Sequence, residues 1–463
     1  MGMLGILNIG TTALLAAQSA LNTVSNNVAN VSTPGYTRQK VELSSIPSGL
    51  TSLTGASGNG VTVTDIKRLY DSFTTLQLRN EESTSSYWNT YSNYASSIEN
   101  TFNETSTTGI GPAISDFFNA WQQVAQNPQG TTERTALLNK AQYLCSRING
   151  AYNDLSNQQT QIYKNSQDLV TQVNNISQQI NILNAKIVSS PGALDLQDQR
   201  DSLVEQLNQI TSVTTVQDGK GRYDVYLGGT ALVDATGSYG MSVSLDPATN
   251  AMQFTVGANN IDVTSQIKGG TGGQLKANIV ARDSTISGYI NNLNTFATDF
   301  SSAINTQQNA GFDLNGSAGN ASGNSFFTTP LTVAARDIAV AIKDPRLIAA
   351  SSSAAGVPGD NANAQAMANL ADVACVASNT STPLNYYRNI VSAVGTDAQS
   401  ANTYVSFETS MVNQLQSQRQ ATSGVSLDEE ATNLLQYQKS YEAAAKMISM
   451  GSDLLETIIG MIK

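Results

Sequence analysis

The sequence predicts a mainly α-helical protein with a β insertion: a discontinuous, long helical coiled-coil stem built from both termini, with an outer β-rich domain inserted in the middle. Apolar residues recur every seven positions near both ends and in the centre of the chain, as in helices that pack on other helices. Residues 212–267 instead alternate apolar and polar side chains between turn signals, as strands do. A length of 463 residues leaves room for several domains.

The first helix is expected over residues 10–32. Its apolar positions repeat at heptad spacing and predict a seam that packs on another helix. No charged residue occurs from Leu4 to Thr37, and Pro34-Gly35 should stop the helix. The predicted interface residues of this helix are Leu7, Leu14, Leu21, Val24, Val28 and Val31.

The last helix is expected from Leu427 to Lys463. Ser426 and Glu429 have the spacing of a capping box, and three consecutive acidic residues suit the positive end of the helix dipole. Its predicted interface residues are Leu427, Leu434, Tyr437, Tyr441, Ile448, Leu455, Ile458 and Ile462. Neither terminal helix can bury its seam alone. They pair within one chain, or they form a tube with copies from neighbouring chains, and the uncharged outer face of the first helix favours the tube.

Further helices are expected at 151–188, 193–210, 286–304 and 396–421. Together with the two ends they suggest four domains. These are a terminal assembly domain (1–70 and 400–463), a helical stem (71–211, 268–310 and 361–399), the β-rich insertion (212–267) and a small irregular outer segment (311–360).

The composition argues against catalysis and against several classes of partner. Charged residues are only 13% of the chain, and Asn, Gln, Ser and Thr make up roughly 37% once the apolar residues, Gly and Pro are also subtracted. There is no histidine, which removes the commonest general base and zinc ligand. A net charge of −11 argues against nucleic acid, and no apolar run is long enough to cross a membrane. We therefore expect no enzyme, no cofactor and no metal site.

Two features could still have carried chemistry. The run Gly269–Gly273 is glycine-rich like a phosphate loop, but it lacks the Lys-Ser/Thr ending, so a hinge back into the stem is favoured. Asp195, Asp198 and Asp201 could offer oxygens to a divalent ion, but a solvated helix face is favoured.

Short motifs near both ends resemble the bacterial flagellar axial proteins, which form the rod, the hook and the hook-associated structures. The stretch from Asn22 to Arg38 is similar to their N-terminal motif, and its Thr-Pro-Gly-Tyr-x-Arg ending resembles the hook-associated protein 1 branch. The segment from Gly424 to Glu430 is similar to the same branch. The residues that carry the motif are Asn26, Asn27, Asn30, Thr33, Pro34, Gly35, Tyr36, Arg38, Ser426, Asp428, Glu429 and Glu430.

The resemblance implies a structural protein of the hook–filament junction that assembles with itself as a ring-like homo-oligomer. It implies the hook protein and a second hook–filament junction protein as neighbours, and export through the flagellar type III apparatus to an extracellular position. The lack of a basic segment before the first apolar residues agrees with export without a Sec signal. An export chaperone would bind the C-terminal helix, with Leu434, Tyr437, Tyr441 and Ile448 as its hypothetical contacts.

Alternatives from other classes remain open at this point. The protein could be a secreted surface adhesin whose β insertion binds a surface, or another axial component such as hook or filament. A hydrolase that uses only carboxylates would need a pair of acidic residues, and the sequence offers no convincing pair.

Overall fold

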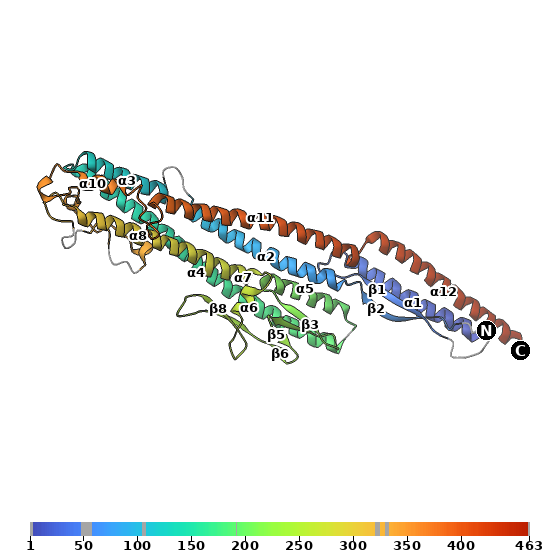
Figure 1. Cartoon of the computed structure of the whole chain (residues 1–463). Coiled ribbons are helices and arrows are strands. Elements are labelled where there is room, and N and C mark those ends of the chain that lie inside the picture. Colours follow the sequence, from blue (N-terminus) through green and yellow to red (C-terminus); the bar gives the residue numbers. More distant parts are fainter. Residues whose placement is uncertain are drawn as a thin grey trace.

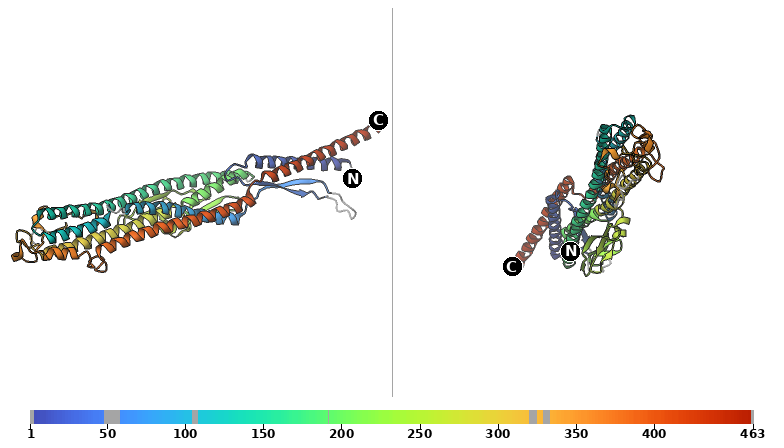
Figure 2. Two further views of the ribbon diagram at one scale, coloured as in Figure 1. Left: turned by 90° about the horizontal axis from the view of Figure 1, so that it is seen from above. Right: turned by 90° about the vertical axis from the view of Figure 1, so that its left-hand side faces the viewer.

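The computed structural model describes residues 3–47, 58–103, 108–190, 192–319, 325–328 and 333–461. The molecule is elongated, and the first and last helices lie together at one end of it (Figure 1). We call this end, made of α1, β1, β2 and α12, the head, and the long helical remainder the stem. A turned view shows the head continuing the long axis of the stem (Figure 2).

The head consists of α1 (Met3–Ala29), β1 (Gln39–Ser45), β2 (Val61–Arg68) and α12 (Leu427–Met461). The long stem helices are α2 (Ser72–Thr101), α3 (Ile110–Gln126), α4 (Thr131–Ser189), α5 (Leu194–Ile210), α8 (Ser287–Ala310) and α11 (Pro383–Ser423). Shorter helical elements are α6 (Thr264–Gly269), α7 (Gln274–Ile279), a π-helical turn η1 (Val280–Ile286), α9 (Ala334–Asp337), η2 (Pro345–Leu347), η3 (Ala354–Gly356) and α10 (Ala362–Asn369).

In the head, α1 and α12 form an antiparallel pair with close backbones. A side chain at Gly10 would meet Ile448, and one at Gly451 would meet Leu7, so small residues allow the approach. The buried line on α1 runs through Ala16, Ala17, Ala20, Val24 and Asn27 rather than through the leucines of the predicted seam. Small side chains thus define the seam, because they let the helix axes come closer than leucine would.

The ribbon β1–β2 was not predicted. Its strands pair antiparallel from Gln39 opposite Arg68 to Ser45 opposite Val61, and the ribbon packs against α1. The predicted start of the C-terminal assembly segment at residue 400 is also corrected. That position lies inside α11, which continues unbroken to Ser423 and packs along α2. The two helices are antiparallel, since Ser92 donates a hydrogen bond to Asn402 while Gln416 donates one to Glu82.

Aromatic side chains form the core of the outer end of the stem. Phe117 contacts its neighbours edge-on, Trp121 is fully buried, and Phe326 and Phe327 bring a distant segment into the same cluster. Such aromatic contacts add stability beyond the area they bury. The segment 311–360, expected to be irregular, is therefore held to the helices by its own buried aromatic residues.

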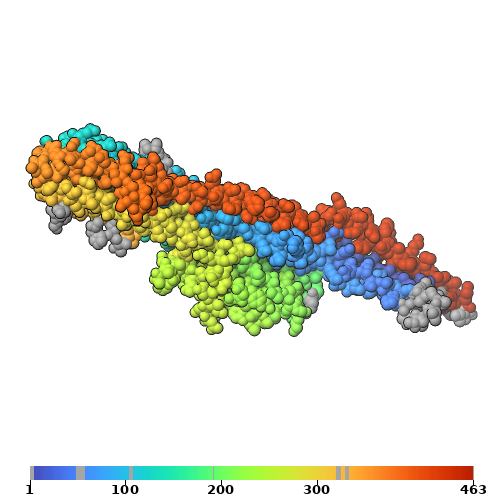
Figure 3. All heavy atoms as spheres, in the orientation of Figure 1, coloured from blue at the N-terminus to red at the C-terminus, as the bar shows by residue number. Residues whose placement is uncertain are grey.

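The β insertion forms two small antiparallel sheets beside α4. Their orders are β3-β4-β5-β6 and β7-β8-β9. The strands are β3 (Thr214–Gln217), β4 (Tyr223–Leu227), β5 (Thr230–Asp234), β6 (Gly237–Ser238), β7 (Met241–Leu245), β8 (Met252–Val256) and β9 (Ile261–Asp262). The insertion protrudes from one side of the stem (Figure 3).

Helical amide side chains hold the non-helical segments in place. Asn184 donates to the carbonyl of Tyr223 at 2.8 Å and accepts from its N–H at 3.0 Å, and Asn174 makes the same pair of bonds with Met241. Asn305 does so with Phe327. Each amide pairs with the backbone N–H and carbonyl of one residue of the segment that it holds. These contacts account for part of the high Asn and Gln content of the chain, because uncharged amide side chains make them.

The glycine run that was considered as a phosphate loop has a structural role. The backbone of Gly272 packs on Ser83, and Gly273, at a φ of +97°, donates its N–H to the carbonyl of Ser83, so this run is a close crossing into the stem. In the described part of the chain, no cluster of acidic, Cys or His residues could hold a metal ion. Among the same residues, no helix is long and apolar enough to span a membrane.

Candidate assembly site

The motif residues from the two ends of the chain converge where the head meets the stem. Asn27 on α1 is 1% exposed, and its amide donates to Glu430 on α12 at 3.0 Å and to the carbonyl of Gln39 at 2.9 Å. Its oxygen accepts from the hydroxyl of Tyr36 at 2.8 Å and from the N–H of Gln39 at 2.9 Å. One buried asparagine thus joins the first helix, the motif loop, the ribbon and the last helix.

Arg38 is the positively charged residue of this group. It donates to Glu430 at 2.7 Å and to Glu429 at 2.6 Å. Glu430 is buried, whereas Glu429 is largely exposed. The predicted capping box is modified, because the N–H of Glu429 lies 3.5 Å from the hydroxyl of Ser426 while its carboxylate pairs with Arg38. The pairing of residues 38 and 429–430 explains why the two motifs occur together.

Asn26, Asn30, Thr33 and Gly35 shape the turn between α1 and Arg38. Asn30 donates to the carbonyl and to the side chain of Asn26, and Thr33 donates to Asn30. Gly35 has a φ of +80°, a conformation that glycine adopts without strain. This turn places Tyr36 and Arg38 toward the buried asparagine.

The same turn meets α5 of the stem. The N–H of Thr37 donates to Asp198 at 3.1 Å, and Arg68 at the end of β2 donates to Asp198 at 2.7 Å and to Asp201 at 2.8 Å. The prediction that Asp198 and Asp201 lie on a solvated helix face is wrong, since both are buried by the head, and only Asp195 is exposed. Their partner Arg68 was missed because nothing in its local sequence marks it.

Burial and charge shift the pKa values at this site. Burial, together with the negative charges of Asp198 and Glu430, raises the pKa of Tyr36 to about 12, so the hydroxyl stays protonated and can donate to Asn27. Burial lowers the pKa of Arg68, but Asp201 and Asp198 outweigh it and the value lies above the ordinary one. For Asp198 burial prevails over its hydrogen bonds with Arg68 and Thr37, and its pKa is raised.

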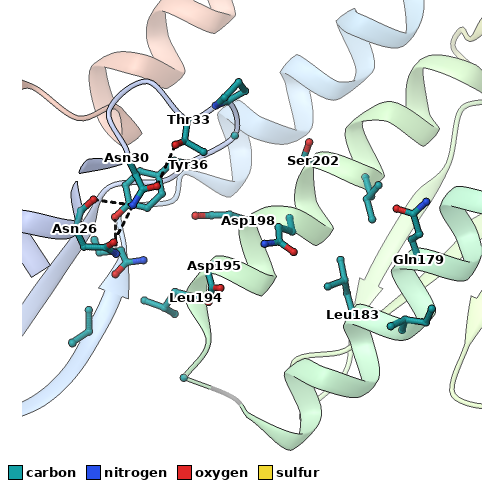
Figure 4. A pocket seen from close by; sticks show the side chains of 18 residues that line it. Asn26, Asn30, Thr33, Tyr36, Gln179, Leu183, Leu194, Asp195, Asp198 and Ser202 are labelled. Carbon is teal, nitrogen blue, oxygen red and sulfur yellow. Dashed lines mark hydrogen bonds between the residues drawn. The ribbon is translucent and has the colours of Figure 1, made fainter. Parts of the chain in front are cut away.

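An open groove of about 870 Å³ lies between the motif loop and the α4–α5 end of the stem. In the close view, Asn26, Asn30, Thr33 and Tyr36 stand on one side of it and α5 on the other (Figure 4). The groove carries apolar and polar side chains from separate elements, including Leu183, Leu194 and Asp195. Of the side chains that line the groove, Asp195 and Asp198 are the acidic ones.

The predicted interface residues fall into three groups. Val24 is buried between the head helices. Half-buried residues at the margin of that contact are Leu7, Leu14, Leu21, Leu434, Tyr437, Ile448 and Leu455. Exposed residues are Val28, Val31, Leu427, Tyr441 and Ile458. Ile462 lies outside the described residues. The intrachain pair therefore uses only part of the predicted seam.

A second apolar line on α12 was not predicted as such. Met447, Met450, Leu454, Ile458 and Met461 are exposed and follow one another at spacings of three and four residues, so they share one helix face. Leu435 and Ile459 are exposed on the same helix, and Leu15 is exposed on α1. Heptad counting selected the face toward α1 and missed this face, although the spacing of the methionines could have revealed it.

Comparison with known proteins is consistent with this geometry. A family model described as "Flagellar hook-associated protein FlgK helical domain" matches residues 95–327, just over half of the chain. Two further models match the ends: "Flagella basal body rod protein" at residues 7–37 and "Flagellar basal body rod FlgEFG protein C-terminal" at 416–461. These end segments are the two head helices with their connecting motif residues.

Full-length relatives are similar over nearly the whole chain. Flagellar hook-associated protein 1 of Bacillus subtilis is 29% identical over 98% of this chain and 97% of its own, and that of Escherichia coli is 28% identical over 99% and 100%. The solved structure of the flagellar hook junction protein FlgK from Burkholderia pseudomallei has a similar fold, with a TM-score of 0.64 at 18% identity, and covers 75% of this chain and all of that one. With its helical domain and both terminal motifs matched, the chain belongs to the flagellar hook-associated protein 1 (FlgK) family.

Proposed function

We propose that this protein is a structural component of the bacterial flagellum that forms the junction zone between hook and filament by self-assembly. Family membership supports this function, and the observation that carries it furthest is the exposed apolar face of the head. Met447, Met450, Leu454, Ile458 and Met461 offer a continuous stripe that the described residues leave uncovered. An exposed apolar stripe of this length marks a surface that another molecule covers.

The surface that is proposed to cover this stripe is the head of a neighbouring copy of the chain. The pair α1–α12 buries its small residues within the chain and still leaves apolar residues on both helices facing outward. The heptad pattern left two alternatives open, pairing within one chain and packing between copies. Here both apply: α1 and α12 form an antiparallel pair within the chain, and such pairs build a ring-like homo-oligomer. The hook protein and a second hook–filament junction protein are the proposed axial neighbours.

An export chaperone is the proposed partner before assembly. Of its hypothetical contacts, Leu434, Tyr437 and Ile448 are half-buried near α1, and Tyr441 is exposed. A chaperone that used these residues would compete with α1 for α12. Its binding and the folding of the head would then be mutually exclusive, as delivery of an unassembled chain requires.

The location proposed is the extracellular flagellum, reached through the flagellar type III apparatus, and the proposed role is structural rather than enzymatic. The low charge and the amide-rich surface suit a protein whose purpose is packing. The groove at the motif loop contains no arrangement of acid and base that would suggest turnover.

Electron microscopy of intact flagella with a labelled antibody to this protein tests the proposal. We expect label in one narrow band between hook and filament. Label along the hook or the whole filament would move the protein to another axial role. Absence of label from the flagella of cells that produce this protein would contradict the flagellar role altogether and favour a surface adhesin.

A further inference from the structure

The head and the stem are two bodies that touch through a narrow region. In the described part of the chain, each head element packs substantially only against other head elements. Two short links join the bodies: residues 69–71 connect β2 to α2, and residues 424–426 connect α11 to α12. Because both links have only three residues and lie close together, the head can rotate about them, and the head and the stem do not form one continuous rod.

Polar contacts hold this region together. Arg68 of the head reaches Asp198 at 2.7 Å and Asp201 at 2.8 Å on α5, and all three side chains are at most 9% exposed. The N–H of Thr37 donates to Asp198, and the N–H of Arg38 donates to the carbonyl of Ser423 at 3.0 Å. No other ion pair in the described residues joins the ribbon to α5.

Apolar packing does not close the joint around these contacts. The groove of about 870 Å³ lies on one side, and an opening of about 600 Å³ lies beside the motif loop, where this loop meets α5 and the end of α11. Interiors that fix one arrangement are close-packed, and this region is not. The angle between head and stem therefore depends on the ion pairs.

We propose that Arg68, Asp198 and Asp201 form a latch that sets the angle of the head on the stem, and that opening the latch lets the head swing as one body about residues 69–71 and 424–426. A buried ion pair contributes little net stability compared with separately hydrated ions, yet it strongly specifies geometry. Opening exposes Arg68 and Asp198 to water together, while Asp201 keeps its contact with the buried Arg79 of α2 at 3.7 Å. The internal bonds of the head, centred on Asn27 and Glu430, remain intact.

The latch would let one chain fit neighbours at different angles without unfolding. The outward apolar face of the head could then follow the curvature of the structure on which it packs, while the stem keeps its own contacts. This inference concerns the chain alone and does not depend on which flagellar zone it occupies.

A disulfide across the joint reports the closed state. A Cβ atom built at Gly35 would lie 3.6 Å from the Cβ of Ser202 on α5, within the range that disulfides use. The test uses the purified full chain with Cys145→Ala and Cys375→Ala, which removes the two native thiols, together with Gly35→Cys and Ser202→Cys. The rate of bond formation under mild oxidation is measured in dilute solution, by thiol titration and gel mobility.

Two variants are then compared in this background. Arg68→Met leaves Asp198 without an ionic partner and Asp201 with only Arg79 of α2 at 3.7 Å, so the head is no longer tied to α5 by an ion pair, and we expect the disulfide to form at least about tenfold more slowly. Lys67→Met is the matched control, because Lys67 is the next residue of the strand and its pair with Glu42 at 2.8 Å is exposed and within the head. It should crosslink at the parent rate. A cysteine at position 35 strains the backbone equally in the parent and in each variant, so this strain does not affect the comparison.

Three results would overturn the latch. Equal rates for Arg68→Met and Lys67→Met would show that the ion pairs do not hold the head. Failure of the parent to crosslink would show that the head does not dock in the free chain. A fall in the thermal unfolding temperature of the stem in Arg68→Met, together with the slower crosslinking, would make Arg68 part of the stem fold. A variant with Asp198→Asn and Asp201→Asn, which retains Arg68, should slow the crosslink in the same way.

Discussion

Asn27 and Glu430 are 403 positions apart in the chain, and the amide of one donates to the carboxylate of the other at 3.0 Å in a site closed to solvent. Arg38 completes the group by donating to the same carboxylate. This contact joins the N-terminal and C-terminal motifs into one structural unit. The head therefore depends on residues that the linear sequence keeps at its two extremes.

Replacing Glu430 with Ala should unfold or loosen the head selectively. The change removes a buried acceptor of Asn27 and leaves Arg38 only its exposed partner Glu429. Breaking a buried pair costs about 3–5 kcal/mol, and the remaining contact with Glu429 offsets part of this loss. Hydrogen exchange of the amides paired between β1 and β2 measures the loss. Glu429→Ala is the control, since Glu429 pairs with the same arginine from an exposed position and should cost less than about 1 kcal/mol. Equal effects of the two variants would contradict the role assigned to Glu430.

Charge on the exposed stripe of α12 should block assembly without damaging the chain. Met450→Asp and Leu454→Asp place carboxylates where a neighbouring head is proposed to pack, and burying an unpaired carboxylate is costly. We expect at least about tenfold less protein in isolated flagella, with unchanged unfolding of the purified chain. Gln438→Asp adds the same charge at another exposed position of the helix. The idea fails if Met450→Asp is incorporated as well as this control.

Two residues of the predicted seam give a complementary test. Leu434→Asp together with Tyr441→Asp should prevent incorporation and motility, because Leu434 is half-buried near α1 and Tyr441 lies at the exposed margin of α12. Swimming in soft agar and the amount of protein in purified flagella are the measurements. Normal motility of this variant would remove the seam from the assembly mechanism.

The pairing of α2 with α11 should weaken as pH rises. Burial, and then the neighbouring carboxyl of Glu81, raise the pKa of Glu408 to about 7 from an ordinary 4.5. The folded state therefore holds a proton that the unfolded state releases, and stability is lost as pH rises from about 5 through 7.

Glu408→Gln removes this penalty. The variant should be more stable than the parent at pH 8 by on the order of 1–2 kcal/mol, and no more stable at pH 4, where the glutamate is protonated in both states. Thermal unfolding across this pH range is the measurement. Glu99→Gln changes an exposed carboxylate on α2 and should leave the pH profile as it is. A profile for Glu408→Gln that parallels the parent at every pH would refute the assignment.

The amide contacts of α4 should hold the β insertion to the stem. Asn184→Ala leaves the N–H and carbonyl of Tyr223 without partners in a buried setting, a cost of about 1–3 kcal/mol. We expect faster hydrogen exchange through β4 and its neighbours, with α4 itself unchanged. Asn175→Ala is the control on an exposed position of the same helix. Identical exchange in the two variants would mean that the sheets hold themselves in place.

The sequence predicted the helices where apolar spacing was regular and long. The segment 193–210 and the helix that starts at Leu427 match the structure closely, because an N-cap or a Pro-Gly turn marks their ends. The continuous α4 was predicted only from residue 151 onward, although the buried Ala141 and Ile148 extend the seven-residue series of Leu155 and Ile162 back into its first third.

The joint was harder to predict because its contacts are long-range. Asp198 and Asp201 look like a solvated face until Arg68 covers them, and the local sequence does not show that ion pair. The ribbon β1–β2 was missed for a related reason, as its strands of seven and eight residues are separated by a long connection. Motif resemblance did select Asn27, Tyr36 and Arg38, whose contacts the structure then explains.

Because α1 packs antiparallel on α12, the N-terminal helix depends on the C-terminal helix for its packing surface. A chain that stops before Leu427 would keep the whole stem and yet leave α1 with no helix to pack on and Arg38 with no carboxylate to bind. Only a complete copy can present a finished head to its neighbours. A product truncated after the stem would therefore lack the surface through which copies are proposed to meet.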